Sequence, residues 1–409
     1  MTPSPSAAER PKVAYFVYCH PGEYDQITGG TWSNIAMLRS LSTVDVLVVT
    51  NHDAALVEEL DRLGVRREVI AAELSYSGVG RSPVRLLRTL ANTVMFNARF
   101  FQAMRRERVQ VVQCDETAAT FMGFGARLAG CALVVAYRNY PGVVPKMKAY
   151  YKIPTVLADR IVATADVLRE AIVTQGWLSP ASRTECIYNG IDLDVVAKRR
   201  GELDRAKVRA DLGIGDGEVA LGIIASLVPV KKQAEFLEEV MPTLAPELEK
   251  RNARIHLIGG VKHDEYGDRC QAAIRNHDLG RVVKIVGYVR DMAPWYVALD
   301  VSVYPGIEGV ARTLIESAAY ELPIVALSGC GEAVIHGKTG LLAPTRGELA
   351  TPILRLASDV ELRRTLGAGG KALAEERFNV RKNRERYQAL YKELSARRAA
   401  SPPAGDRHG

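Results

Sequence analysis

The sequence predicts an α/β protein built from two doubly wound, Rossmann-like domains that face each other across a cleft. A chain of 409 residues is too long for one ordinary core and suits two domains of about 200 residues each. Short runs rich in Val, Ile and Ala alternate with longer segments of helical periodicity, which is typical of parallel sheets with crossover helices. The alternation is interrupted once, by a charged stretch at 198–217, and then begins again.

The predicted strands form two groups, one on each side of that charged stretch. In the first group they are expected at 13–19, 46–50, 109–114, 133–137 and 160–164. In the second group they are expected at 219–225, 254–259, 282–286, 301–304 and 322–327. The first expected domain is 1–197, of which 1–11 is a disordered lead-in, and the second is 198–375. A closing helix at 376–394 is expected to pack back toward the first domain, and a mobile tail follows at 395–409.

Composition and cysteine usage exclude several classes of protein. No apolar run reaches the roughly 18 residues of a membrane helix, and the first residues lack a secretory signal, so a cytoplasmic protein is expected. The six cysteines are scattered singly, which favours free buried thiols, and no metal site is predicted. The net charge of +7 suits anionic partners, but no interleaved aromatic and basic platform indicates nucleic acid.

Two glutamates lie around a predicted helix start. A buried strand is expected to end at Pro305, a loop with Glu308 and Gly309 follows, and a helix is expected to begin near Val310 and carry Glu316. A helix start presents unpaired N–H groups and a positive dipole end, which suits a diphosphate, and a glycine lets the backbone approach it. A helical glutamate can accept hydrogen bonds from paired sugar hydroxyls. Taken alone, such glutamates more often cap a helix or lie on its exposed face.

Three other elements strengthen the ligand-binding interpretation. The four glycines in 329–340 permit tight turns at the carboxyl end of a sheet, where open parallel sheets bind ligands. Lys231 follows a strand at a helix start, where it can neutralise a departing diphosphate, although a solvated lysine is equally compatible with the pattern. Gly29 and Gly30 precede a helical run and predict a second phosphate-accepting loop.

Together and in this order, the features resemble the retaining glycosyltransferases of family 4, which have the GT-B fold. The resemblance covers nearly the whole chain. It rests on the Gly29-Gly30 loop, the IYNGIDLDVV segment at 187–196, the Leu-x-Pro-x-Lys loop that ends at Lys231, the two glutamates Glu308 and Glu316 separated by seven residues, and the Gly-rich turn with Glu332. Each motif alone is weakly specific, whereas the set is specific.

The resemblance implies a reaction and a donor site. The reaction is transfer of a sugar from a nucleoside diphosphate-sugar of UDP or GDP type to an acceptor hydroxyl, with retention and without a metal, a cofactor or a protein nucleophile. Glu316 would bind the donor ribose, and Glu308 the hydroxyls of the transferred sugar. The base would meet 287–291, centred on Val289. The diphosphate would be held by Lys231 and the amides of Gly309, Val310, Ala311, Arg312 and Thr313.

The chain departs from the family at two places. Relatives commonly carry an arginine where this donor site has Ser226, and Arg312 could replace that cation or lie on the surface. Many relatives carry a histidine after the fourth strand, where this chain has Asp115 and Glu116, which could face the acceptor or cap the next helix. Glu308, Lys231 and Asp115 are therefore the candidate catalytic residues. Arg138 could face the acceptor or anchor a loop.

Two questions stay open at this point. The segment 80–108 alternates arginines with apolar residues, which favours a helix covering the first sheet and is also compatible with contact to an anionic membrane. The departures would suit a catalytically silent nucleotide-sugar-binding or scaffold protein, whereas the retained Glu308, Lys231 and Glu316 favour an enzyme. The acceptor could be a sugar, a lipid-linked glycan or a small natural product.

Overall fold

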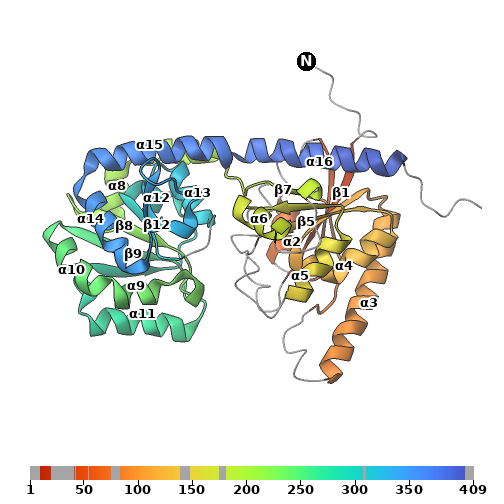
Figure 1. Cartoon of the computed structure of the whole chain (residues 1–409), viewed down its shortest axis with the longest axis horizontal. Coiled ribbons are helices and arrows are strands. Elements are labelled where there is room, and N and C mark those ends of the chain that lie inside the picture. The colour runs from red at the N-terminus through yellow and green to blue at the C-terminus, as the bar shows by residue number, and fades with distance from the viewer. Residues whose placement is uncertain are drawn as a thin grey trace, which may run out of the picture. The chain divides into compact units, whose positions relative to one another are not determined.

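The chain divides into two compact units in a computed structural model that describes residues 10–19, 41, 43–53, 55–74, 83–138, 148–174, 181–306 and 310–400. One unit comprises Met1–Asn189 with Arg381–Gly409, and the other comprises Gly190–Val380 (Figure 1). The sequence had placed this boundary after residue 197. The structure places it earlier because helix α7 (Leu193–Gly201) belongs to the second unit, where Arg200 pairs with Glu321 at 2.5 Å.

The first unit contains a sheet of seven parallel strands in the order β3-β2-β1-β4-β5-β6-β7. Its central strands are buried on both faces, as all six residues of β5 are, which explains their Val- and Ala-rich sequences. The short strands β3 and β7 were missed, since three residues carry too little periodicity. The strands are β1 (Lys12–Val17), β2 (Asp45–Thr50), β3 (Arg67–Val69), β4 (Val111–Asp115), β5 (Ala132–Tyr137), β6 (Arg160–Ala163) and β7 (Thr184–Cys186).

Helices cover both faces of this sheet because side chains alternate along each strand. Tyr15 lies in one core cluster with residues of α2 and α16, whereas Phe16 points the other way and packs against Phe96 and Phe100 of α3. Helices α3, α4 and α5 lie side by side (Figure 1). The helices are α2 (Ala55–Arg62), α3 (Pro83–Arg106), α4 (Glu116–Leu128), α5 (Lys148–Leu157), α6 (Asp166–Thr174), the 3₁₀ turn η5 (Ala181–Arg183) and α16 (Val380–Ala400).

Helix α16 closes the first unit, which it joins from the carboxyl end of the chain. Tyr387, Leu390, Tyr391 and Leu394 follow a helical spacing and enter the core beside β1 and β4. The helix runs six residues beyond the predicted end at 394, so the tail predicted from Ser395 begins too early. The added turn is held in place because the NH2 group of the Arg398 guanidinium donates a hydrogen bond to the Cys131 carbonyl at 3.2 Å.

The second unit contains six parallel strands in the order β10-β9-β8-β11-β12-β13. The five predicted strands are each found within two residues of their expected ends. The sixth strand, β13, begins at the end of the segment for which glycine turns are predicted. The strands are β8 (Val219–Ile224), β9 (Ala253–Ile258), β10 (Val283–Gly287), β11 (Val301–Tyr304), β12 (Ile324–Leu327) and β13 (Gly340–Ala343).

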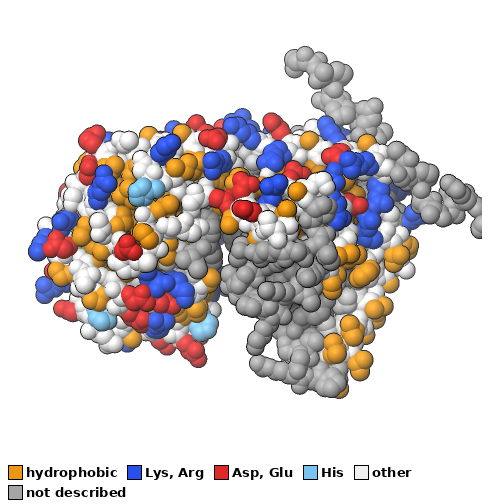
Figure 2. Space-filling model, in the orientation of Figure 1, with side chains coloured by type: hydrophobic (Ala, Val, Ile, Leu, Met, Phe, Trp, Pro, Cys, Tyr) orange, Lys and Arg blue, Asp and Glu red, His pale blue; other side chains and the backbone are white. Residues whose placement is uncertain are grey.

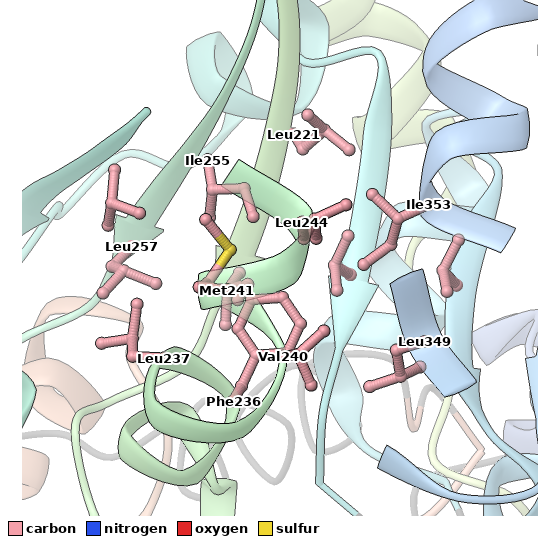
Figure 3. Packing of buried hydrophobic residues seen from close by; sticks show 14 of the residues in the cluster. Leu221, Phe236, Leu237, Val240, Met241, Leu244, Ile255, Leu257, Leu349 and Ile353 are labelled. Carbon is pink, nitrogen blue, oxygen red and sulfur yellow. The ribbon is translucent and has the colours of Figure 1, made fainter. Parts of the chain in front are cut away.

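Helices α9 and α10 form much of the core of this unit. Phe236, Val240 and Leu244 recur at four-residue spacing and pack onto Ile255 and Leu257 of β9 (Figure 3). The further elements are α7, α8 (Arg205–Asp211), η6 (Pro229–Lys231), α9 (Gln233–Glu239), α10 (Met241–Lys250), α11 (Asp264–Asn276), η7 (Leu279–Arg281), α12 (Ala293–Ala298), α13 (Arg312–Ala319), η8 (Ser328–Cys330), η9 (Arg346–Leu349), α14 (Ala350–Ser358) and α15 (Val360–Arg377).

Each sheet has a point where the strand order reverses. In the first unit β2 and β4 flank β1, and in the second β9 and β11 flank β8, so consecutive crossovers leave in opposite directions. A crevice opens at such a point beyond the carboxyl ends of the strands, and ligands of doubly wound sheets bind there. A ligand site is therefore expected among the residues that follow β8 and β11.

All six cysteines are free thiols, and all but Cys19 are buried, which confirms the prediction. Within the described ranges, no helix has the length and apolar character needed to cross a membrane.

Candidate functional site

Lys231 connects the two strands at the reversal point of the second sheet. The chain leaves β8, makes the turn η6 and places Lys231 at its end. The Lys231 Nζ atom donates to the Tyr304 hydroxyl at 3.3 Å and lies 5.6 Å from the centre of that ring. Tyr304 is the last residue of β11 and is buried. The cation therefore lies across the carboxyl ends of β8 and β11, supported by a buried aromatic ring.

Hydrogen bonds from a buried glutamine side chain hold the loop that carries Lys231. The buried side chain of Gln233 donates through Nε2 to the carbonyls of Ser226 at 2.9 Å and Ala225 at 3.4 Å. A Cβ atom at Gly259 would lie 2.1 Å from the Ala225 oxygen, so only glycine allows β9 to approach this loop. Ser226 is thus placed by its backbone, and it supplies no cation of its own.

The amino end of α13 lies beyond β11. The helix begins at Arg312, two residues later than expected, because Ala311 has extended backbone angles and forms the N-cap. An alanine N-cap provides no side-chain acceptor, so the first-turn amides are not capped by it and suit an anionic ligand. Val310 and Thr313 flank this start. Of the backbone groups predicted for the diphosphate, those at 310–313 therefore lie where the chain enters α13 after β11.

Glu316 is held by two donors rather than exposed on the helix surface. Its Oε2 accepts a hydrogen bond from the Tyr296 hydroxyl at 2.7 Å, and its Oε1 accepts one from Arg312 Nε at 2.7 Å. Tyr296 is buried and stacks on Tyr320 with ring centres 4.9 Å apart. Burial and the nearby Glu316 carboxylate raise the pKa of Tyr296 well above its usual value, which keeps it a donor. The surface interpretation of Glu316 does not fit this environment.

The glycine-rich turn and the predicted base-binding segment occupy neighbouring strand ends. The Cys330 thiol, in the turn after β12, donates to the Gly306 carbonyl at 3.8 Å and so links that turn to the end of β11. Val289 follows β10 and is half-buried, and nearby Asp291 is paired with Arg199 and accepts a hydrogen bond from the Ala293 amide at 3.2 Å. These segments thus surround the carboxyl edge at which Lys231 lies.

The reversal point of the first sheet is occupied by an ion pair. Arg138, just after β5, donates through Nε to Asp115 at 2.8 Å, through NH2 to Tyr15 at 3.1 Å and through NH1 to Asn189 at 3.3 Å. Burial alone would lower the pKa of Arg138, but Asp115 and Tyr15 raise it above its usual value. Glu116 is buried and accepts a bond from the Arg138 amide at 3.3 Å. The anchoring role weighed for Arg138 is the one these contacts support, and Asp115 does not cap α4 with its side chain.

Some predicted residues lie outside the described part of the chain, namely Gly29, Gly30, Glu308 and Gly309. Three residues that shape the site were not singled out from the sequence: Tyr304, Tyr296 and Gln233. A tyrosine at the end of an otherwise apolar strand was the available signal for Tyr304. Among the described residues, no group of three or more His, Cys, Asp or Glu side chains could hold a metal ion.

Family comparisons agree with the two units. Residues 218–359 match the family model described as "Glycosyl transferases group 1", and residues 43–195 match the model described as "Glycosyltransferase Family 4". The chain belongs to this glycosyltransferase family. The predicted family and the two-domain α/β fold class of GT-B type are confirmed.

Individual relatives of this family 4 glycosyltransferase chain are distant. The capsular polysaccharide biosynthesis glycosyltransferase CapM of Staphylococcus aureus is 22% identical over 250 residues, which span 59% of this chain and 63% of CapM, so less than two thirds of that protein is matched. The structure of Anabaena Alr3699/HepE in complex with UDP has a TM-score of 0.76 at 19% identity. The match covers 94% of this chain and 100% of the HepE chain. A glycosyltransferase from Rickettsia africae has a TM-score of 0.76 at 16% identity, with 94% and 98% covered. HepE has also been solved with UDP-glucose.

Proposed function

We propose that this chain transfers a sugar from a nucleoside diphosphate-sugar, of UDP or GDP type, to an acceptor hydroxyl with retention of configuration. The observation that carries the proposal is that two features follow strands at the reversal point of the second sheet: Lys231, which contacts Tyr304 at the end of β11, and the start of α13, whose N-cap alanine makes no side-chain hydrogen bond. A diphosphate placed there is neutralised by the lysine and accepts hydrogen bonds from the helix amides. The UDP complexes of the HepE structure favour a UDP-sugar as the first donor to test.

The residues around this point would divide the donor between them. Glu316 would bind the ribose hydroxyls, oriented by the hydroxyl of Tyr296. Ribose binding would compete with Arg312 for the second carboxylate oxygen, and the guanidinium at the helix start would then turn toward the diphosphate. Val289 would contact the base. Glu308 would bind the transferred sugar.

The chemistry would be carried by charge stabilisation. In the proposed front-face reaction the bond from the anomeric carbon to the phosphate oxygen breaks, and the acceptor oxygen forms a bond to that carbon on the same face. The acceptor proton passes to the leaving phosphate oxygen. Lys231 and the α13 amides would stabilise the negative charge that develops on the diphosphate, so no metal and no protein nucleophile is required in this scheme.

For the acceptor we propose a saccharide, either a growing polysaccharide or a lipid-linked glycan, rather than a small natural product. The similarity to a capsular polysaccharide glycosyltransferase supports this choice. For such an acceptor we place the reaction in the cytosol, beside the cytoplasmic face of a membrane. Asp115 would lie on the acceptor side of the reaction, held in place by Arg138.

The reaction can be tested with purified chain and a panel of UDP-, GDP- and ADP-sugars. Release of the nucleoside diphosphate and a product mass increased by one sugar are expected, and proton NMR of the product should show the anomeric configuration of the donor. Activity should persist in EDTA. A catalytically silent scaffold would bind a donor and neither hydrolyse nor transfer it, and that outcome would reject the enzyme proposal.

A further inference from the structure

Exposed apolar side chains gather on three neighbouring helices of the first unit. In the described residues sixteen large hydrophobic side chains are exposed, and ten of them belong to α3, α4 and α5. These helices pack side by side, and Figure 2 shows hydrophobic side chains in a row over α3. Single exposed apolar residues are normal on a protein surface, whereas a contiguous group of them marks a binding surface.

The two halves of α3 have different environments. In the carboxyl half Phe96 and Phe100 are buried against the sheet, as expected for a covering helix. In the amino half Leu87 is 67% exposed, Leu90 is 50% exposed and Val94 is 69% exposed. The interpretation that this basic segment simply covers the first sheet therefore holds for one half of the helix. The other half presents an apolar stripe that nothing in the described chain covers.

The apolar stripe continues onto α4. The Asn97 side chain accepts a hydrogen bond from the Gly125 amide at 2.6 Å, and a Cβ atom at Gly125 would lie 2.5 Å from the Asn97 carbonyl oxygen. The two helix backbones therefore touch. Phe124 and Leu128, one residue before and three after this contact, are 56% and 76% exposed. Exposed side chains of 84–95 in α3 and these two residues form what we call the α3–α4 surface.

Basic residues border this surface. Helix α3 contains five arginines and neither Asp nor Glu. Arg88, Arg99 and Arg106 are spaced by eleven and seven residues, which places them along one edge of the helix. Arg88 pairs with Glu73 at 3.0 Å, but both side chains are more than 70% exposed, so this pair is weak. Arg88 can therefore readily exchange Glu73 for another anion. Arg106 pairs with Glu68 at 2.8 Å.

We propose that the α3–α4 surface docks onto an anionic phospholipid membrane. An apolar face bordered by arginines is the arrangement by which interfacial helices insert side chains below the headgroups while their cations bind lipid phosphate. A second copy of this chain fits less well, because a two-fold contact would bring two acid-free, arginine-rich helices together. Docking involves residues outside the donor site, so it goes beyond the proposed transfer. The docking proposal can be wrong while the transfer proposal is correct.

The apolar part of the proposal is tested by co-sedimentation of the full chain with vesicles of phosphatidylcholine alone or mixed with phosphatidylglycerol. The wild type should bind the anionic vesicles. Leu87→Glu with Val94→Glu should weaken that binding at least about tenfold, since two charges would have to enter the apolar layer. The matched control, Val195→Glu with Val360→Glu, changes exposed valines of α7 and α15 in the second unit and should bind as the wild type does.

The charge part is tested with Arg88→Gln and Arg99→Gln, two of the arginines along that edge of α3. Each arginine near an anionic surface contributes about a fivefold gain in binding, so the pair should weaken it about tenfold to thirtyfold at low salt. Lys198→Gln with Arg364→Gln removes two exposed cations from the second unit and serves as control. Binding to neutral vesicles should be at least about tenfold weaker than binding to anionic vesicles.

A third variant avoids any question of folding. Val94→Trp keeps the surface apolar, and its added emission should shift to the blue on anionic vesicles. Failure of the wild type to bind anionic vesicles, or equal losses in the control variants, would overturn the proposal. So would a dimer in analytical ultracentrifugation that Leu87→Glu with Val94→Glu converts to monomer, because the surface would then bind a second copy. None of these measurements requires a sugar donor.

Discussion

The two sheets have the same architecture and opposite contents at their reversal points. Beyond β8 and β11, Lys231 contacts a buried tyrosine, and the helix that follows β11 has an N-cap that offers no side-chain acceptor. Beyond β1, β4 and β5, Arg138 is bound to Asp115, Tyr15 and Asn189. Lys231 contacts the hydroxyl and ring of Tyr304, whereas the Arg138 guanidinium donates to a carboxylate, a hydroxyl and an amide oxygen of the protein. The proposed function makes the first position a ligand site and the second a structural anchor.

The largest effect is expected at Lys231. Replacing it by Ala should lower transfer about 10²- to 10³-fold, because the charge developing on the leaving diphosphate would lose its cation. Lys231→Arg should retain part of the rate. The matched control is Lys250→Ala, which removes an exposed lysine just before β9, at the opposite edge of the same sheet. Steady-state kinetics with the preferred donor measure this effect, and near wild-type rates for Lys231→Ala would remove the proposed donor site.

Arg138 should show the opposite behaviour. Arg138→Ala leaves the Asp115 carboxylate and the Tyr15 hydroxyl without this donor and should destabilise the first unit by about 2 kcal/mol, a value reduced because Asp115 is partly exposed. Hydrogen exchange resolved by segment should place the loss in the first unit. Arg312→Ala, which breaks an exposed pair in the second unit, should cost under about 0.5 kcal/mol of stability. If Arg138→Ala kept full stability and abolished transfer, the cluster would be a ligand site and the comparison would fail.

Tyr296 tests how the proposed donor site is built. Tyr296→Phe removes the bond to Glu316 and should raise the KM for the donor about threefold to tenfold with little change in kcat, because a hydrogen bond that orients a binding carboxylate contributes about 1 kcal/mol. Tyr320→Phe keeps the stacked rings and is the control. An unchanged KM in Tyr296→Phe would show that Glu316 does not need this orientation.

The smallest effect concerns pH. Burial alone would raise the pKa of Glu235, but hydrogen bonds from Lys232 and Tyr266 hold it at about 2, below its ordinary value near 4.5. A depressed carboxyl pKa stabilises the fold above 4.5, and that stability is lost as the pH falls from 4.5 toward 2. Between about pH 7 and pH 3.5 the second unit should lose about 1 kcal/mol through this group. Denaturant titrations should show that Glu235→Gln loses this dependence and that Glu238→Gln keeps it.

The sequence predicted the elements at the reversal point of the second sheet better than the contacts at that of the first, for a physical reason. A strand, a glycine loop and a helix carrying Glu316 are adjacent in the chain, so local patterns give their order and nearly their bounds. Arg138 and Asp115 are 23 residues apart, and Tyr15 is 123 residues from Arg138. Nothing local indicates that their side chains meet. The same limit applies to Tyr304, whose partner lies 73 residues away.

The short strands and the exposed half of α3 were missed for other reasons. Strands β3 and β7 have three residues each, and Arg67–Val69 has no apolar alternation to detect. An amphipathic pattern in α3 shows that one face is apolar, but it does not tell whether the sheet beneath is long enough to cover that face. Only the packing against α4, set by Asn97 and Gly125, shows which residues stay exposed.

The most direct test of the account is calorimetric titration of UDP, GDP and ADP into the wild type, Lys231→Ala and Lys250→Ala. The account predicts that one of these nucleoside diphosphates binds the wild type and Lys250→Ala with the same affinity. It predicts binding to Lys231→Ala weakened at least about tenfold, because a charge-assisted contact is lost. Equal affinity for all three proteins, or no binding of any nucleoside diphosphate to the wild type, would contradict the assignment of the donor site.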